Sequence, residues 1–173
     1  MKKFASVLVV LVLVLSQIAF GESDIFNPEK LVNTYNLAVI SVLTLAGTAA
    51  GDTSNTELYS AMMMVEYKGT ADGLVCYENF DGSFTIAFEG KSRNDTATAV
   101  LAYADLSRSS IVEHYPLLPF MFAVAAKDSN GNGIDALEWA KNLSDKATYF
   151  GNDYIAIATR QNNDHIAISL FPN

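Results

Sequence analysis

Bulky and small side chains alternate on both sides of Asp81-Gly82, and this pattern restricts the fold more than any other stretch. Asp-Gly is a strong two-residue signal for a β-hairpin with a type I′ turn, in which both residues have positive φ. Counting outward from this turn places the bulky side chains on one face, as Asn79 opposite Phe84, Tyr77 opposite Ile86 and Val75 opposite Phe88. The other face is small or polar, as Glu78 opposite Thr85, Cys76 opposite Ala87 and Leu74 opposite Glu89. This asymmetry predicts an antiparallel strand pair with one buried face.

A second hairpin is predicted at the C-terminal end, with Asn162-Asn163 as its turn. Its predicted register again groups the large side chains, as Thr159 opposite Ile166, Ile157 opposite Ile168 and Ile155 opposite Leu170. The small ones share the other face, as Ala158 opposite Ala167 and Ala156 opposite Ser169. Residues 97–106 suit a further strand, although their alanine content also suits a helix. These patterns predict one antiparallel sheet made of two hairpins plus a fifth strand.

Two helices are predicted before the first hairpin. Asn27-Pro28-Glu29 supplies an N-cap, a first-turn proline and a first-turn carboxylate for a helix that runs to about Gly47. Its apolar centre also suits a membrane span, but polar residues interrupt the run. The capping box at residues 54–57 begins a second helix, which runs through Lys68 and ends at Gly69. The predicted buried stripe of this second helix consists of Leu58, Met62 and Val65, with Ala61 beside them.

Two further helices are predicted at residues 115–127 and 135–146. The predicted fold class is therefore α+β, a single antiparallel sheet packed on one face by about four helices. Its opposite face would carry small side chains, namely Cys76, Ala87, Ala156, Ala158, Ala167 and Ser169. Contiguous apolar surface usually marks a contact, so we expect more helix, a second copy of the chain or another protein partner to cover this face.

The first 21 residues are typical of a signal peptide. Lys2 and Lys3 form the positive region, residues 4–19 are apolar, and Ala19 and Gly21 are the small residues at the cleavage site. An uncleaved anchor is the alternative, since the apolar run is only slightly shorter than a membrane span. Cleavage leaves residues 22–173 as a single domain that is periplasmic or secreted, with no stable membrane association. The net charge of −8 disfavours nucleic acid as a partner.

Short oxygen-bearing side chains alternate with glycine in residues 128–138, between the last two predicted helices. This stretch resembles the calcium loop of the EF-hand family. The resemblance implies that Asp128, Asn130 and Asn132 are ligands at loop positions one, three and five. It also implies that Glu138 is the closing carboxylate, and Asp135 is a further candidate ligand.

The loop departs from the EF-hand pattern at two points. One residue is missing after Gly133, so Glu138 falls at position eleven instead of twelve, and two of the early ligands are neutral asparagines. Because calcium affinity follows the number of charged oxygens, we expect a weak site, on the order of 10⁻⁴ to 10⁻³ M. The alternative is a plain interhelical turn in which Asp135 and Glu138 cap the following helix.

Signals of catalysis are sparse. The sequence has no G-x-S-x-G elbow, and its two histidines, His114 and His165, lie in no metal-binding pattern. His165 falls at a predicted hairpin tip, where we expect a solvated residue. The leading hypothesis is therefore an exported, non-enzymatic binding or interaction module, stabilised by one weak calcium site. The alternatives are a small secreted hydrolase that uses dispersed carboxylates, among them Glu66, Glu78, Glu89 and Glu113, and a sensor or carrier for apolar ligands.

Overall fold

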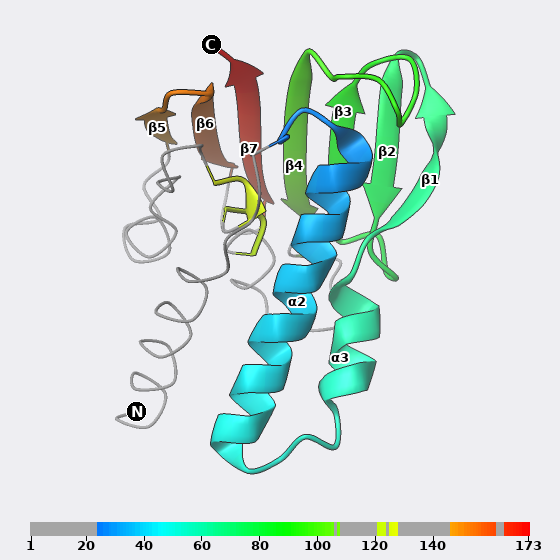
Figure 1. Ribbon diagram of the computed structural model, residues 1–173, viewed down its shortest axis with the longest axis vertical. Coiled ribbons are helices and arrows are strands. Elements are labelled where there is room, and N and C mark those ends of the chain that lie inside the picture. The colour runs from blue at the N-terminus through cyan, green and yellow to red at the C-terminus, as the bar shows by residue number, and fades with distance from the viewer. Residues whose placement is uncertain (1–23, 106, 108–120, 124, 128–145, 162–164) are drawn as a thin grey trace.

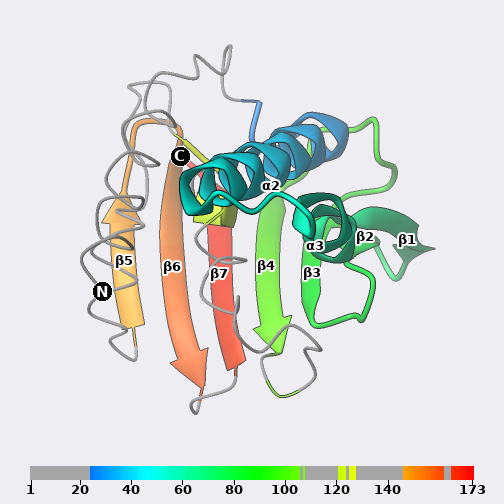
Figure 2. The same cartoon turned by 90° about the horizontal axis from the view of Figure 1, so that it is seen from below.

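The computed structural model describes residues 24–105, 107, 121–123, 125–127, 146–161 and 165–173. Its main feature is a seven-stranded antiparallel sheet with the strand order β1-β2-β3-β4-β7-β6-β5. Two helices lie next to each other on one side of this sheet (Figures 1 and 2). The elements are α2 (Pro28–Ala50), α3 (Thr56–Met63), β1 (Glu66–Ala71), β2 (Leu74–Glu78), β3 (Phe84–Glu89), β4 (Ala99–Asp105), β5 (Lys146–Phe150), β6 (Tyr154–Gln161) and β7 (His165–Pro172).

The predicted fold class, five strands packed by about four helices, is wrong in both numbers. The sheet has seven strands, because β1 and β5 form from residues for which no strand was predicted. Within the described part of the chain, only α2, α3 and a short helical stretch at residues 121–123 and 125 are helical. Most of the predicted helices at 115–127 and 135–146 lies outside the described residues.

The first hairpin has the predicted register but a different turn. Each predicted pair from Leu74 opposite Glu89 to Glu78 opposite Thr85 is present between β2 and β3. In the turn, Gly82 has a φ of 69°, whereas Asp81 is not among the residues with positive φ, so the type I′ turn is wrong. The buried Asn79 explains the difference, since its side-chain oxygen accepts the Phe84 N–H at 2.8 Å and closes a wider loop at residues 80–83.

The second hairpin is shifted by one residue from the predicted register. Ala156 pairs with Leu170 and Ala158 pairs with Ile168, so these alanines lie on the face that carries the large side chains of β7. The pairing of β7 with β4 accounts for the shift. In that pairing Val100 lies opposite Leu170. One hydrophobic core buries Val100 together with Ala156, Ala158, Ile168 and Leu170. The small-residue face is therefore wrong as predicted, because Ala156 and Ala158 are core residues with exposures of 1% and 3%.

The strand interpretation of residues 97–106 is confirmed by β4. This strand lies at the centre of the sheet, between β3 and β7. Val100, Ala102 and Ala104 are buried, whereas Leu101 and Tyr103 on the opposite side are exposed. Both faces of β4 carry apolar side chains. Because β3 and β7 pair with its two edges, this alanine-rich segment forms a strand.

The N-cap of α2 is confirmed, and the helix is longer than predicted. The Asn27 side chain accepts the Lys30 N–H at 3.0 Å, and the helix continues past Gly47 to Ala50. Gly51, with a φ of 72°, ends it in the left-handed conformation. A Cβ atom at Gly47 would lie 2.7 Å from the Thr56 Oγ1 atom, so glycine at this position lets the start of α3 approach α2 closely.

By length and composition, α2 is also able to cross a membrane. The segment Pro28–Ala49 contains an 18-residue window with a mean hydropathy of 1.4, and 39% of that window is buried inside the protein. Core helices pass the same test, and one side of α2 is packed in the hydrophobic core through Leu31, Val32, Tyr35, Ala38, Val39, Val42 and Leu43. This one-sided burial supports the interpretation of α2 as a core helix.

The second predicted helix is only half present. It begins at Thr56 without the predicted capping box, because the Ser54 hydroxyl donates to Asp52 and the Asn55 side chain makes no capping hydrogen bond. It ends at Met63. The predicted stripe is wrong at Leu58, which is 58% exposed, whereas Val65 is buried and Met62 packs against the core. Asn36 of α2 accounts for the early end. Its amide accepts the Val65 N–H at 2.9 Å and donates to the Val65 carbonyl at 3.0 Å, which holds the chain extended into β1.

Candidate functional site

The predicted calcium ligands, Asp128, Asn130, Asn132, Asp135 and Glu138, lie outside the described residues. Among the residues that are described, no group of three or more His, Cys, Asp or Glu side chains is arranged to hold a metal ion. The calcium hypothesis therefore remains a prediction from the sequence.

The face of the sheet that points away from the helices is exposed and largely apolar. We call it the open face. Alternation along each strand creates it, since neighbouring residues such as Val100 and Leu101 point to opposite sides. Its large exposed side chains are Leu74 (42%), Leu101 (40%), Tyr103 (37%), Phe150 (75%) and Phe171 (42%). Four strands, β2, β4, β5 and β7, contribute these side chains, so the exposed apolar residues extend across the sheet.

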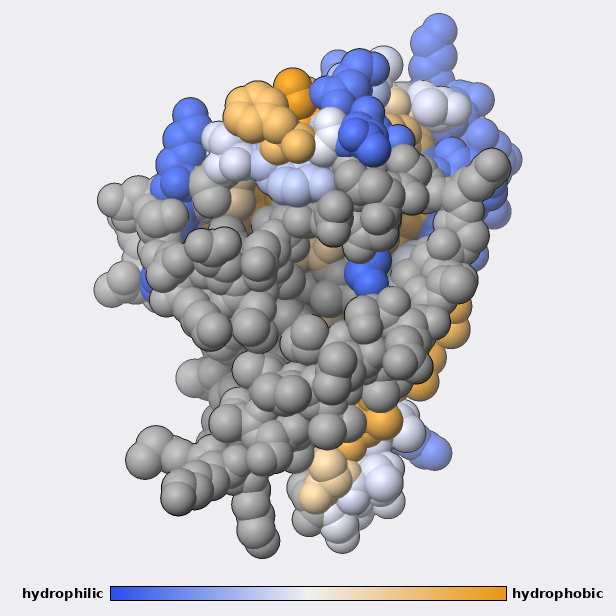
Figure 3. Space-filling view, turned by 60° about the vertical axis from the view of Figure 1, so that its left-hand side comes forward, coloured by the Kyte–Doolittle hydropathy of each residue, from blue (hydrophilic) through white to orange (hydrophobic). Residues whose placement is uncertain are grey.

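Figure 3 shows hydrophobic residues reaching the surface near the top of the molecule, where they lie next to strongly hydrophilic ones. A second hydrophobic band appears at the lower right of the same view.

One cross-strand row of the open face runs through all seven strands. We call it the charged row. Its members are consecutive Cα partners in the sheet, in the order Glu66, Glu78, Thr85, Tyr103, Ala167, Thr159 and Lys146. The two carboxylates lie at the β1 end, Lys146 lies at the β5 end, and Tyr103 stands in the middle. This row is therefore polarised from an acidic end at β1 to a basic end at β5.

The adjacent row is uncharged, and we call it the neutral row. It runs through Cys76, Ala87, Leu101, Ser169, Ile157 and Thr148. Leu101 occupies its centre on β4, in the same strand as Tyr103. The four small residues Cys76, Ala87, Ala167 and Ser169 were correctly predicted to lie away from the bulky side chains of the first hairpin and β7. They surround larger residues on this face instead of forming a uniform small-residue surface.

Tyr103 is held in place by a cluster at the end of β4 and the start of β7. Its hydroxyl lies 2.7 Å from the His165 Nδ1 atom, and the two rings stack with their centroids 5.9 Å apart. The same nitrogen lies 3.7 Å from a carboxylate oxygen of Asp105, which also accepts the Ser107 hydroxyl at 2.7 Å. His165 is therefore partnered, contrary to the expectation of a solvated residue. The consequence is a fixed aromatic ring at the centre of the open face, which loses little side-chain entropy on binding.

Cys76 is half-buried on the open face and is a free cysteine. Burial and the nearby Glu78 carboxylate raise the pKa of its thiol. A raised thiol pKa lowers the thiolate fraction at neutral pH, and the thiolate is the reactive form. The raised thiol pKa disfavours a nucleophilic role for Cys76, which contributes a small side chain to the neutral row.

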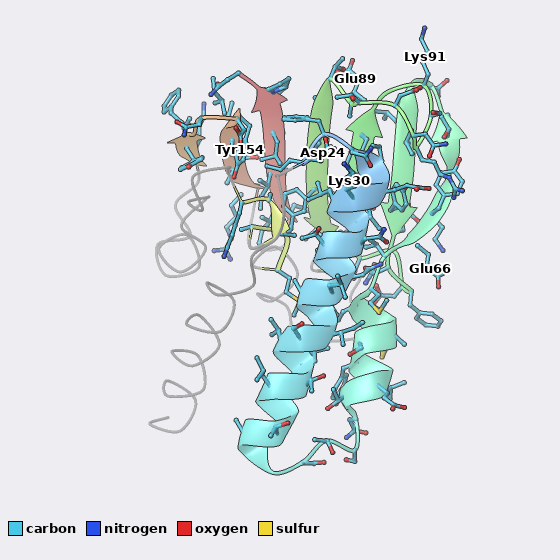
Figure 4. The ribbon with its side chains drawn as sticks, in the orientation of Figure 1. Asp24, Lys30, Glu66, Glu89, Lys91 and Tyr154 are labelled. Atoms are coloured by element: carbon cyan, nitrogen blue, oxygen red, sulfur yellow. The ribbon has the colours of Figure 1, made fainter. Side chains whose placement is uncertain are left out.

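Glu66 and Glu78 lie directly opposite each other on β1 and β2, which brings two of the predicted carboxylates together. Glu66 is exposed on the edge strand at the right of Figure 4. Glu89 lies at the far end of β3 and accepts the Thr98 hydroxyl at 2.8 Å. Enzymes that use two carboxyl groups as acid and base place one of them in a buried, apolar setting, whereas Glu66 is exposed and Glu78 is only half-buried.

Comparison with known proteins gives no matching family model, no matching curated protein and no matching solved structure. Sequence reasoning missed Leu101, Tyr103, Phe171 and Lys146 as members of one surface. The signal that joins them is the pairing of β4 with β7, which links residues 60 to 70 positions apart and is not readable from local alternation.

Proposed function

We propose that this chain is an exported, non-enzymatic interaction module that binds a protein surface through the open face of its sheet. The observation that carries this proposal is the group of exposed Leu101, Tyr103 and Phe171 side chains on β4 and β7, on the face opposite the helix-covered core. Exposed apolar surface that is contiguous and bordered by charge favours association over solvation. Tyr103, already fixed by His165, has the properties of an interface anchor.

The sheet supports the proposal by its rigidity. β4 and β7 pair along six residue positions, and the opposite side of both strands is packed into the hydrophobic core. The open face is therefore preorganised, so a partner would bind it without a large loss of backbone entropy.

Export rests on the N-terminal sequence. Lys2 and Lys3 precede an apolar run, and Ala19 and Gly21 match a cleavage site. An excess of 19 acidic over 11 basic residues is compatible with a periplasmic or secreted protein. We include export in the proposal on this basis.

We further propose that residues 128–138 bind one calcium ion weakly, with Asp128, Asn130, Asn132, Asp135 and Glu138 as ligands. The support is their oxygen-rich spacing. Calcium would then act as a structural ligand, raising stability by mass action without taking part in recognition at the open face.

A small hydrolase is the second candidate, and the pairing of Glu66 with Glu78 favours it. We rank it below the interaction module because this pair sits at the edge of an open sheet, where water is not excluded. Hydrolysis of glycoside or ester substrates that is lost in a Glu66→Gln, Glu78→Gln double variant would reverse this ranking.

Photo-cross-linking in the exporting cell tests the proposed function directly. A photoreactive amino acid is placed at position 101 on the open face or, as a matched control, at position 58, where Leu58 of α3 is also exposed. We expect a discrete cross-linked protein species from position 101 and none from position 58. Equal labelling at both positions, or none at 101, would remove the open face from the account.

A further inference from the structure

We infer that the partner of the open face is a second copy of this chain, in a two-fold sheet sandwich whose axis runs parallel to the strands and passes by β4. This inference rests on the proposed function, because it names the occupant of the same surface. It follows from the order of charges along the charged row, from the central position of β4, and from the size of the sheet.

The charge order selects one way of placing two sheets face to face. A two-fold axis parallel to the strands reverses the strand order, so β1 of one copy lies over β5 of the other. Glu66 and Glu78 of each copy then approach Lys146 of the other, at the same level along the strands, because all three belong to the charged row. A two-fold axis perpendicular to the strands would instead place β1 over β1 and bring the carboxylates together. Like charges disfavour that arrangement, and opposite charges favour the first.

The centre of the sheet is self-complementary under the same rotation. β4 is the middle strand of the seven, so the axis places β4 of one copy over β4 of the other. Leu101 and Tyr103 then meet their own counterparts, and β3 faces β7 across the contact. An isologous interface of this kind needs an apolar centre and charges that match end to end, and the two rows provide both.

The area of the open face is sufficient for a stable dimer. Neighbouring strands lie about 4.8 Å apart, so seven strands span roughly 29 Å. Strands of five to eight residues are roughly 17 to 27 Å long, which gives a flat area of roughly 500 to 800 Å². Side chains make the accessible area larger than this, and standard interfaces bury about 800 Å² per partner.

Edge-to-edge pairing of sheets is the competing geometry, and both edges oppose it. β1 contains a bulge between Tyr67 and Gly69 and carries Glu66 and Lys68. β5 is only five residues long and begins with Lys146. Bulges, short length and charge are the features by which edge strands resist the addition of another strand. On the open face, Glu66, Glu78 and Lys146 lie toward the two sides, whereas Glu89 of β3 and Asp105 of β4 lie at strand ends, where they accept the Thr98 and Ser107 hydroxyls.

Sedimentation equilibrium over a wide range of concentrations tests the inference, using the mature chain with Lys146→Glu, Glu66→Lys and both changes together. We expect the unaltered chain to dimerise, each single charge reversal to weaken the dimer about tenfold, and the double variant to recover to within about threefold. Lys91→Glu and Glu57→Lys are matched controls, because they make the same charge changes outside the strands, and they should leave the dimer unchanged.

A chain that stays monomeric at every concentration would overturn the inference, and so would single reversals without effect or a double variant weaker than either. These failures are distinguishable from failure of the proposed function. If position 101 cross-links to a different protein while the chain is monomeric, the interaction module stands and the second copy is excluded as its partner. If position 101 cross-links to nothing, both proposals fall.

Discussion

Replacing Leu101 by alanine is expected to weaken the dimer about 30-fold. The side chain is 40% exposed in the single chain. Burying a whole leucine side chain contributes about 1.5 to 3 kcal/mol, so covering this exposed part contributes about 1 kcal/mol. A two-fold interface contains the residue twice, which gives about 2 kcal/mol per dimer, or roughly 30-fold in the dissociation constant.

The same substitution also affects folding. The covered part of Leu101 contacts its own sheet, so its loss lowers the free energy of unfolding by about 1 to 2 kcal/mol. Dimerisation is therefore measured well below the unfolding transition, by sedimentation equilibrium at several loading concentrations. Leu58→Ala is the control, because Leu58 is 58% exposed on α3, away from the open face.

Two outcomes would refute the reasoning behind the Leu101 prediction. An unchanged dissociation constant in Leu101→Ala would show that β4 is not at the contact. A larger loss in Leu58→Ala than in Leu101→Ala would place the contact on the helix side of the molecule.

Three further predictions concern the fold and the calcium loop. Asn79→Ala should lower the free energy of unfolding by about 2 to 3 kcal/mol in urea titrations, because it leaves the buried Phe84 N–H unpaired. The control is Asn55→Ala, which loses no capping hydrogen bond and should change the free energy of unfolding by less than about 0.5 kcal/mol. Burial raises the pKa of Tyr35 well above its usual value, so the stability that Tyr35 contributes as a neutral phenol is complete below about pH 10 and is lost as pH rises further. Tyr35→Phe should therefore lose less stability above pH 10 than the unaltered chain, as followed by circular dichroism. An equal loss of stability in the two chains would contradict this prediction. Millimolar Ca²⁺ should raise the melting temperature more than Mg²⁺ does, and this difference should vanish in an Asp128→Ala, Glu138→Ala double variant; no difference in the unaltered chain would remove calcium from the account.

The register of the first hairpin was predictable because its two faces differ strongly in size. A slip of one residue would put Val75, Tyr77 and their bulky partners on the small-residue side, so local alternation alone decides the pairing. The turn type was not predictable, since it depends on a buried hydrogen-bond network around Asn79 that also reaches the Met62 carbonyl at 3.3 Å.

In the second hairpin, side-chain size does not decide between the two registers. Ile155 and Ile157 on one side of β6 are as bulky as the residues of β7, so large side chains fit either register. The choice is made by β4, which pairs with β7 and directs Ile168 and Leu170 into the core. Local pattern cannot supply a pairing partner that is distant in the sequence.

The helix at residues 54–68 was overextended for a related reason. Its helical periodicity is compatible with the sequence, but Asn36 binds the backbone of Val65 and favours a strand from Glu66 onward. The open face followed neither from composition nor from motifs, because Leu101, Tyr103 and Lys146 become neighbours in one surface only through the sheet. The sequence drew attention to residues 128–138, where spacing and residue type are visible without any tertiary contact.

The most direct test of the central claim is hydroxyl-radical footprinting of the mature chain, carried out at low and at high protein concentration. The account predicts that Tyr103, Phe171 and Leu101 become protected as concentration rises, while Leu37, Ile40 and Leu58 on the helix side keep their reactivity. Protection of the helix residues instead, or no change on the open face at concentrations where a larger species forms, would contradict the claim that this face is the interaction surface.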